Sequence, residues 1–410
     1  MSNLKKIEGG VTTPQGFTAG AVYTAIKKRE NKKPDVAVLY SDLPCSCAAC
    51  FTTNKFCAAP VILDREILKK GKARAVVINS GNANAATGKQ GIEDAHTVER
   101  EAEKLLGLGE DEVFVCSTGV IGQRLPVDKV LQGIREIIPA KLAKENGSEA
   151  AYAIMTTDTV RKECAYELQL STGTVKIGAM AKGSGMIHPN MATMLVFITT
   201  DCAISPAMLQ KALSTDIANT FNMVSVDGDT STNDMVTVLA NGLAGNAEIT
   251  AEGKDFTAFM QALNTVTVYL CRCIAGDGEG ATKLLECKVS GAATLDIAKT
   301  VAKSVICSSL TKAAMFGADA NWGRVLCAIG YSGAPVDVSR IDVQFASKAG
   351  TILVCKDGAG VDFSEEEAKK ILLESEIEIL IDLHSGSAVS TAWGCDLTYD
   401  YVKINGDYRT

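Results

Sequence analysis

The segment GMIHPNMATMLVFITTD, residues 185–201, joins a polar turn to an apolar run. From Met194 onward, Met-Leu-Val-Phe-Ile has the branched and aromatic side chains that are typical of a buried strand. The turn before it ends in Ala192 and Thr193, a small residue followed by a hydroxyl. A threonine at the start of a strand is usually a packing residue. Whether Thr193 does more therefore depends on the rest of the chain.

Around this segment, strand-like and helix-like runs alternate. Apolar runs ending in polar turns predict strands at 35–42, 73–81, 112–122, 234–242 and 283–291, and a hairpin at 163–180. Helical spacing predicts helices at 92–107, 128–142 and 256–274, one opened by Ser205-Pro206, and two more after residue 291. Strands are expected to dominate again from about Val336. The pattern indicates an α/β protein with helices layered on mixed sheets.

Composition narrows the class of protein. The chain has 410 residues, of which 47% are hydrophobic and 22% charged, so a large packed core is expected rather than disorder. The net charge is −7, and no long basic block is present, which argues against nucleic acid or an anionic membrane as partner. MSNLKKIEGG at the start has no apolar signal region, and no run is long enough to span a membrane. We expect a cytoplasmic protein.

Fourteen cysteines are present, most of them single residues inside apolar runs, as expected in a reducing compartment. Cys45, Cys47 and Cys50 form a C-x-C-x-x-C cluster that could supply three thiolates to a metal. Only Cys57, at a loose interval, could complete the set. We therefore favour a packed turn over a metal site and expect no metal.

Glycine- and hydroxyl-rich turns follow several of the apolar runs, at 78–88, 117–122, 182–190, 227–234 and 275–283. Such turns can point backbone N–H groups at a small polar ligand. The near match to G-x-G-x-x-G at 276–281 lacks its last glycine and precedes a strand, so we reject a dinucleotide site. The turns predict a site that is assembled from strand ends.

Only three histidines are present, and none has the sequence context of a Ser-His-Asp triad. His96 lies in a charged helix, His384 is ambiguous, and His188 precedes a proline. A nucleophile can also be activated without histidine, when a threonine becomes the N-terminus of a chain. Its own freed α-amino group, whose pKa is near neutral, then acts as the base. Attack of the Thr193 hydroxyl on the Ala192 carbonyl, followed by ester hydrolysis, would create that terminus. Thr118 and Gly119 offer a hydroxyl and an N–H to the oxyanion.

The segment KGSGMIHPNMATML at 182–195 resembles the self-cleaving centre of the ornithine acetyltransferase, or ArgJ, family. Further stretches agree with the same family in order along the chain: FTTN at 51–54, INSGNANAATG at 78–88, STGVIG at 117–122, MTTD at 155–158, GEGATK at 278–283, FGADANWGR at 316–324 and the closing INGDYRT. The resemblance covers essentially the whole chain.

The resemblance implies a layered αββα sandwich of the type shared with the DmpA aminopeptidases, with a smaller C-terminal α/β domain. It implies cleavage between Ala192 and Thr193 into an α chain, 1–192, and a β chain, 193–410, which stay together as an α2β2 assembly. The implied reaction moves the acetyl group of N-acetylornithine to glutamate through Thr193, with no cofactor. Some members also use acetyl-CoA, and the sequence leaves this open.

The resemblance also implies the roles of individual residues. Thr193 is the nucleophile, and Thr118 and Gly119 form the oxyanion hole. The residues that the resemblance predicts to contact substrate, besides Thr193, are Thr156, Lys182, Glu279, Asn405 and Thr410. Thr156 is chosen over its neighbour Thr157 by position alone. The apolar alternation in LTYDYVKIN at 397–405 favours a C-terminal tail that packs onto the rest of the protein. The alternative function is a self-processing aminopeptidase or amidohydrolase that passes its acyl group to water.

Overall fold

A computed structural model of the protein describes residues 3–28, 31–188 and 194–406. The chain forms two compact units. The first lies within residues 1–183, 190–218 and 230–270, and the second within 184–189, 219–229 and 271–410. The units are interleaved along the sequence, so each contains residues from both sides of position 192. The predicted division into an α chain and a β chain is a separate matter and stays a prediction.

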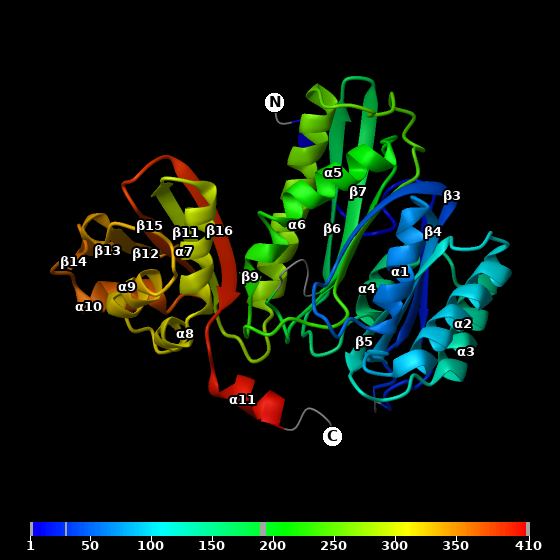
Figure 1. The fold of residues 1–410 in the computed structure, drawn as a ribbon, viewed down its shortest axis with the longest axis horizontal. Helices are drawn as coiled ribbons and strands as arrows, with labels where there is room; N and C mark the ends of the chain where they lie inside the picture. The colour runs from blue at the N-terminus through cyan, green and yellow to red at the C-terminus, as the bar shows by residue number, and fades with distance from the viewer. Residues whose placement is uncertain (1–2, 29–30, 189–193, 407–410) are drawn as a thin grey trace. The chain divides into compact units, whose positions relative to one another are not determined.

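The first unit is built on a nine-stranded sheet, which Figure 1 shows running from blue to green. Its order is β1-β6-β7-β8-β10-β3-β4-β5, and β2 pairs with β3 off this path. The strands are β1 (Leu4–Ile7), β2 (Phe17–Val22), β3 (Val36–Phe51), β4 (Lys72–Asn82), β5 (Val113–Val120), β6 (Lys162–Leu170), β7 (Gly173–Lys182), β8 (Leu195–Thr200) and β10 (Met235–Ala240). The predicted strands and the 163–180 hairpin are confirmed.

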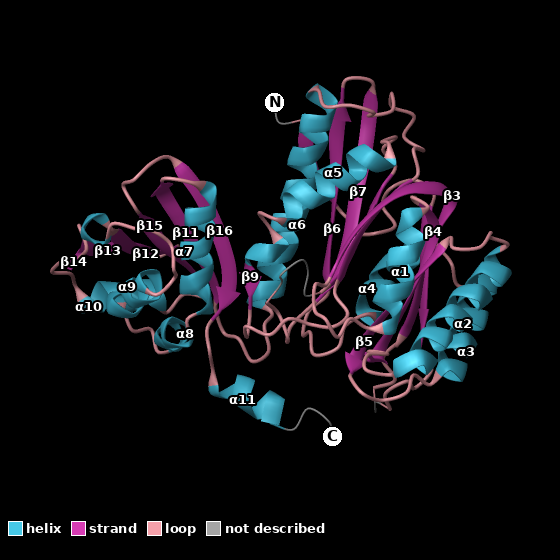
Figure 2. Cartoon of the chain, viewed as in Figure 1, coloured by secondary structure: helices cyan, strands magenta, loops and turns pink. Residues whose placement is uncertain are grey.

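The helices of the first unit pack on these strands, as the cyan ribbons of Figure 2 show for α1 to α3 beside β4 and β5. They are α1 (Ala59–Lys69), α2 (Gly88–Leu106), α3 (Val127–Ala140), α4 (Gly147–Ala153), α5 (Pro206–Ile217) and α6 (Lys254–Gly276), the last of which runs on into the second unit. The predicted caps are present. Gly107 ends α2 in the left-handed conformation, and the Ser205 hydroxyl accepts a hydrogen bond from the Met208 N–H at the start of α5.

The cysteine cluster does not lie in a turn, which corrects our prediction. Cys45, Cys47 and Cys50 are buried in β3, a strand of 16 residues that pairs with β2, β4 and β10. A register shift between Tyr40 and Cys45 lets this long strand bend. Burial raises the pKa of the Cys45 and Cys47 thiols to about 12, so both are protonated at neutral pH.

Strand β8, the run that follows the Ala192-Thr193 segment, is central in this sheet. It pairs antiparallel with β7 and parallel with β10, and all six of its residues are buried. The register places Lys182 opposite Leu195 and Leu195 opposite Met235. The last residue of β7 and the first residues of β8 and β10 therefore lie in one row at one edge of the sheet.

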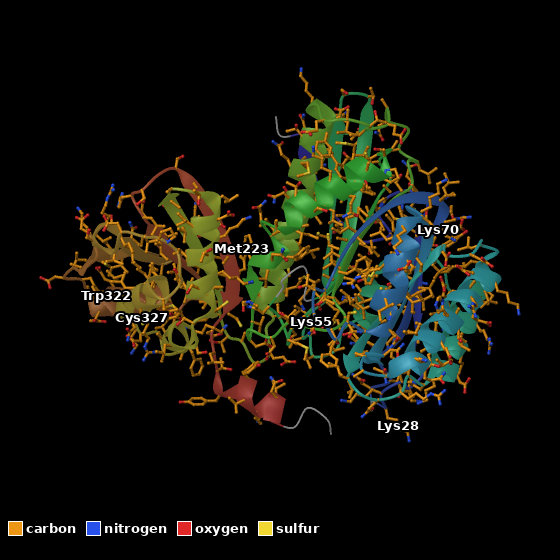
Figure 3. All side chains as sticks on the ribbon, viewed as in Figure 1. Lys28, Lys55, Lys70, Met223, Trp322 and Cys327 are labelled. Atoms are coloured by element: carbon orange, nitrogen blue, oxygen red, sulfur yellow. The ribbon has the colours of Figure 1, made fainter. Side chains whose placement is uncertain are left out.

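The second unit has a seven-stranded sheet of order β14-β13-β12-β15-β11-β16-β9. Its strands are β9 (Val224–Ser225), β11 (Leu284–Ala292), β12 (Asp342–Ser347), β13 (Gly350–Lys356), β14 (Ala359–Gly360), β15 (Glu376–Asp382) and β16 (Ala388–Cys395). Its helices are α7 (Leu295–Cys307), α8 (Ser309–Phe316), α9 (Trp322–Gly330), α10 (Glu365–Leu372) and α11 (Tyr399–Gly406). Trp322, labelled in Figure 3, occupies the space over Gly360, where a Cβ would meet the indole at 2.4 Å.

Two predictions for the C-terminal half were wrong in detail. Residues 295–330 form three helices rather than two, because Ser308 and Asn321 each cap a new helix. The stretch 397–405, in the part of the chain where we expected strands to dominate, is mainly the helix α11, and Tyr399 on it is 84% exposed. Period-two alternation over so short a stretch does not separate a strand from a helix.

The α/β class with layered helices and sheets and a smaller C-terminal α/β part is confirmed. In the part of the chain that the structure describes, none of the helices combines the length and the apolar character needed to cross a membrane.

Candidate active site

The predicted oxyanion turn, Thr118 and Gly119, lies at the end of β5, where it pairs with the end of β4. Gly119 has φ +135°, and a Cβ there would lie 2.3 Å from the Gly81 carbonyl carbon, so only glycine allows the two strands to come this close. The Asn233 side-chain amide donates to the Ser117 carbonyl at 2.8 Å. The turn is therefore held from β4 on one side and from the start of β10 on the other.

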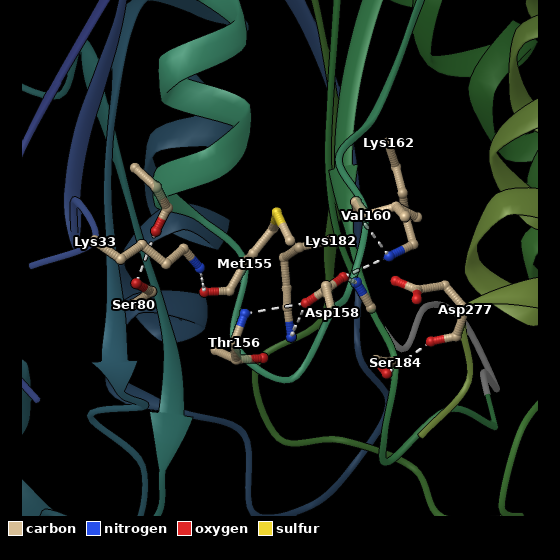
Figure 4. Close-up of polar contacts among 12 residues, drawn as sticks. Lys33, Ser80, Met155, Thr156, Asp158, Val160, Lys162, Lys182, Ser184 and Asp277 are labelled. Carbon is tan, nitrogen blue, oxygen red and sulfur yellow. Dashed lines mark hydrogen bonds and ion pairs between the residues drawn. The ribbon is translucent and has the colours of Figure 1, made fainter. Parts of the chain in front are cut away.

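Thr156 and Lys182, two residues predicted to contact substrate, are brought together by Asp158 (Figure 4). The Asp158 carboxylate accepts a hydrogen bond from the Thr156 N–H at 3.0 Å and lies 3.9 Å from the Lys182 ammonium. The Gly183 N–H also donates to it, at 2.7 Å. Asp158 thus links the loop after α4 to the end of β7.

The same carboxylate pairs with a second ammonium group. Lys162 lies 2.7 Å from Asp158, and both side chains are fully buried. Burial by itself would raise the pKa of Asp158, but Lys182, Lys162 and the hydrogen bonds to the carboxylate outweigh it and hold that pKa below its ordinary value. Asp158 is ionised at neutral pH. Asp158 therefore lies between two ammonium groups, those of Lys162 and Lys182.

The loop that carries Thr156 is also braced from β4 and from the segment before β3. The Lys33 ammonium donates to the Met155 carbonyl at 2.5 Å, and the Ser80 hydroxyl donates to the Ala153 carbonyl at 2.7 Å (Figure 4). Thr156 and Thr157 are both half-buried, so burial does not decide between them.

In the second unit, the predicted substrate residues Glu279 and Asn405 also come together. The Asn405 side-chain amide donates to a Glu279 carboxylate oxygen at 2.8 Å. The Glu279 N–H donates to the Ser184 carbonyl at 3.0 Å, and the Ser184 hydroxyl donates to the Asp277 carbonyl at 2.7 Å. A Cβ on Gly185 would lie 2.3 Å from the Glu279 carboxyl carbon. The glycine of the GMIHPN segment therefore allows Glu279 to lie against the backbone.

Ala192, Thr193 and Thr410 lie outside the described residues. Met194, the next described residue after the predicted cleavage position, accepts a hydrogen bond from the Met235 N–H at 2.9 Å. The segment that follows Thr193 is thus attached to the start of β10, directly after Asp234.

The histidines each have a local partner. His96 contacts Glu99, and His384 contacts Asp342, each at 2.9 Å. The His188 ring lies 3.0 Å from the Ser225 hydroxyl, and burial followed by the Lys303 charge lowers the pKa of His188 to about 4. A neutral His188 can accept a proton, but the structure pairs it with Ser225 and Cys307 of its own unit.

Sequence reasoning did not single out Asp158 as part of the site. It lies in a motif that the resemblance includes, MTTD at 155–158. An acidic residue in a polar turn gives no sign of burial, so the sequence around Asp158 does not reveal that it pairs with lysines from β6 and β7.

Comparison with known proteins places the chain in a family. The fold and the grouped polar residues at the strand ends define it as a layered α/β enzyme. A family model described as the ArgJ family matches residues 18–410, so the chain belongs to the ArgJ family.

Known proteins with similar sequences match this chain over nearly their full length. The Arginine biosynthesis bifunctional protein ArgJ of Symbiobacterium thermophilum is 53% identical over 407 residues, which cover 99% of this chain and 100% of that protein. The protein of the same name from Caldanaerobacter subterraneus is 50% identical with the same coverage. A solved chain of the ArgJ protein from Bacillus halodurans is 50% identical, with a TM-score of 0.50, and the match covers 52% of this chain and 99% of that one.

The close approach at Gly119 predicts a stability effect. Gly119→Ala should destabilise the protein by about 2 kcal/mol or more, because the new Cβ would collide with the backbone of β4 at a strained φ. Gly122→Ala is the matched control in the same turn. Its φ is +77° but nothing lies within 4 Å of the new Cβ, so it should cost only ~1 kcal/mol. Thermal unfolding of both variants checks this, and equal losses would contradict it.

The Asp158–Lys162 pair predicts a pH-dependent effect. Asp158→Asn should cost about 3–5 kcal/mol at neutral pH, because it removes the charged partner of a fully buried ion pair with Lys162. Since the folded protein lowers the Asp158 pKa, this stabilisation is present above the unfolded pKa of about 4 and is lost as pH falls further. The difference in the free energy of unfolding between wild type and variant should therefore be smaller in acid.

Urea unfolding at neutral pH and near pH 3 measures the difference in the free energy of unfolding between wild type and Asp158→Asn. Glu66→Gln is the control, because it removes an exposed ion pair with Lys69 in the same unit and should cost less than about 0.5 kcal/mol. If this difference is the same at both pH values, Asp158 stabilises the protein through packing and not through its charge.

Proposed function

We propose that the protein cleaves itself before Thr193 and then transfers the acetyl group of N2-acetyl-L-ornithine to L-glutamate through an acetyl ester on Thr193. Membership of the ArgJ family makes the chain an acetyltransferase of arginine biosynthesis. The observation that carries the finer proposal is the Asp158-centred group of Thr156 and Lys182, at the edge of the sheet where β8 begins. This group offers a cation and a hydroxyl to an acetylated amino acid.

The chemistry has two halves. In the first, the Thr193 hydroxyl attacks the acetyl carbonyl, its α-amino group takes the hydroxyl proton, and ornithine leaves with its amine protonated. In the second, the amine of glutamate attacks the ester, N-acetylglutamate leaves, and the Thr193 hydroxyl is restored. The Thr118 hydroxyl and the Gly119 N–H would stabilise the oxyanion in both halves.

The remaining residues would select the substrates. The Lys182 ammonium, at the end of β7, suits a substrate carboxylate. Glu279, held by Asn405, suits a cationic amine such as that of ornithine. The role of Thr410 rests on the family resemblance alone.

The relatives support the proposal further. The solved Bacillus halodurans chain spans about half of this chain over nearly its own full length, which is the length expected for one product of cleavage near residue 192. The relatives' names describe bifunctional proteins, so we extend the proposal to acetyl-CoA as a second acetyl donor. The α2β2 assembly of cleaved chains and a cytoplasmic location belong to the same proposal.

Self-cleavage is the first test. Wild-type protein should give two fragments of similar size on a denaturing gel, and the later fragment should begin TMLVF. Thr193→Ala should stay a single chain without transfer activity, because it has no hydroxyl to attack the Ala192 carbonyl, whereas Thr193→Ser keeps one. Thr97→Ala, on the exposed face of α2, is the control and should cleave and transfer normally.

The assay of transfer separates the two candidate functions. With N-acetylornithine and glutamate, cleaved enzyme should form N-acetylglutamate. Release of acetate instead, whether or not glutamate is present, would indicate the hydrolase, and a wild-type protein found only as one intact chain would refute the Thr193 mechanism.

A further inference from the structure

In the second unit, the segment 184–187, shortly before the predicted cleavage position, is held by one carboxylate. The Met186 N–H donates to Asp227 Oδ2 at 2.6 Å, and the Ile187 N–H donates to Asp227 Oδ1 at 2.9 Å. The Ile187 carbonyl in turn accepts from the Val226 N–H at 2.7 Å. Asp227 and the residue before it therefore fix both the N–H and the carbonyl groups of this segment.

The backbone at Met186 shows what these hydrogen bonds do. Met186 has φ +57°, a left-handed conformation that residues other than glycine rarely adopt. Its side chain is 41% exposed, so packing of the side chain does not account for this conformation. A left-handed residue turns successive N–H groups toward one anion, and here they meet the Asp227 carboxylate.

The same carboxylate contacts the C-terminal helix α11. The Tyr401 hydroxyl hydrogen-bonds to the Asp227 side chain. Burial, followed by the charges of Asp227 and Glu279, raises the pKa of Tyr401, so this hydroxyl keeps its proton and is the donor. Asn405, four residues later and thus on the same face of the helix, donates to Glu279 at 2.8 Å.

The helix α11 depends on such anchors. It has eight residues, and none of them, all of which the structure describes, is buried. A helix of this length is not stable by itself. Its first residue, Tyr399, packs edge-on against Phe316, with the ring centroids 5.7 Å apart. The later part of the helix is attached through Asp227 and Glu279.

Asp227 and Glu279 each contact both the segment 184–187 and α11. The Glu279 N–H donates to the Ser184 carbonyl at 3.0 Å, and the Glu279 carboxyl group lies against Gly185. The same carboxyl group accepts from α11. Asp227 repeats this pattern, with two backbone N–H groups of the segment on one side and the helix on the other. The segment and the helix therefore flank Glu279, and Asp227 joins them to each other.

We propose that Asp227 is a positioning residue of the candidate site, which ties the segment 184–187 to α11 and thereby fixes the two elements that flank Glu279. Asp227 acts through Glu279, which the proposed function assigns to the cationic amine of ornithine. The substrate class therefore rests on the proposed function, whereas the tie does not. After the proposed cleavage before Thr193, the tie joins the two chains, because the segment precedes that position and Asp227 follows it.

Hydrogen exchange measured by mass spectrometry tests the tie without any enzyme activity. In Asp227→Ala, peptides that contain Met186 and Ile187 should exchange about tenfold faster than in wild type, because both N–H groups lose a charged acceptor. Peptides from α11 should also exchange faster, although residue 227 is distant from them in sequence. Unchanged exchange in either set of peptides would overturn the proposal.

Tyr401→Phe removes only the hydroxyl, and it decides the outcome if Asp227→Ala does not fold. Exchange in α11 should become about threefold faster, because the helix loses one of its anchors. Residues 186–187 should exchange as in wild type, since their N–H groups keep Asp227 as acceptor. Wild-type exchange in α11 of this variant would refute the contribution of Asp227 to holding the helix.

Asp342→Ala is the matched control. Asp342 is another half-buried acid of the second unit, which accepts from the Asp357 N–H at 2.8 Å and contacts His384 at 2.9 Å. Its replacement should speed exchange near Asp357 and leave both 186–187 and α11 as in wild type. Faster exchange at all of these places would show a general loss of stability and overturn the tie.

The KM for N-acetylornithine tests the positioning role. In Asp227→Ala and Tyr401→Phe, KM should rise by about fivefold while kcat stays within about twofold, because Glu279 is retained but no longer fixed. Asp342→Ala should keep the wild-type KM. Faster exchange with an unchanged KM would overturn the positioning role. If no protein, wild type included, transfers acetyl groups, the proposed function fails, and the exchange results still decide whether Asp227 ties the two elements.

Discussion

The buried ion pair between Asp158 and Lys162 is the interaction on which the candidate site depends. A lone charge in this position would cost several kcal/mol, so each partner needs the other. Its consequence reaches beyond the pair, because the same carboxylate also binds the Thr156 and Gly183 N–H groups and attracts Lys182. One desolvated anion thereby fixes a loop and the end of a strand relative to each other.

Close backbone approach is the second constraint. Gly119 lets β4 and β5 end in contact, and Gly185 lets the Glu279 carboxylate lie against the chain. In both places a Cβ would occupy space already filled by neighbouring atoms. Gly119 also has φ +135°, a backbone conformation that glycine adopts readily and that other residues rarely adopt. The glycine-rich turns of the sequence thus have a steric explanation as well as a proposed chemical one.

Much of the fold follows from local patterns. The strand from Met194, the hairpin at 163–180 and the cap at Ser205 were predictable because apolar periodicity and capping chemistry act over a few residues. The cysteine cluster was not, because a cysteine-rich run fits a turn and a buried strand equally well. The stretch 397–405 was misjudged for a similar reason, since its pattern is too short to separate a helix from a strand.

The sequence by itself determined the layered α/β class, the family resemblance and the turns that carry the candidate site residues. It did so because element type and motif are encoded in neighbouring residues. Only the tertiary structure decided that Asp158 binds two lysines and that Asp234, directly before β10, is buried. The charge of an acid depends on its burial and on partners that strand register supplies from distant parts of the chain. Neither can be read from the residues on either side of it.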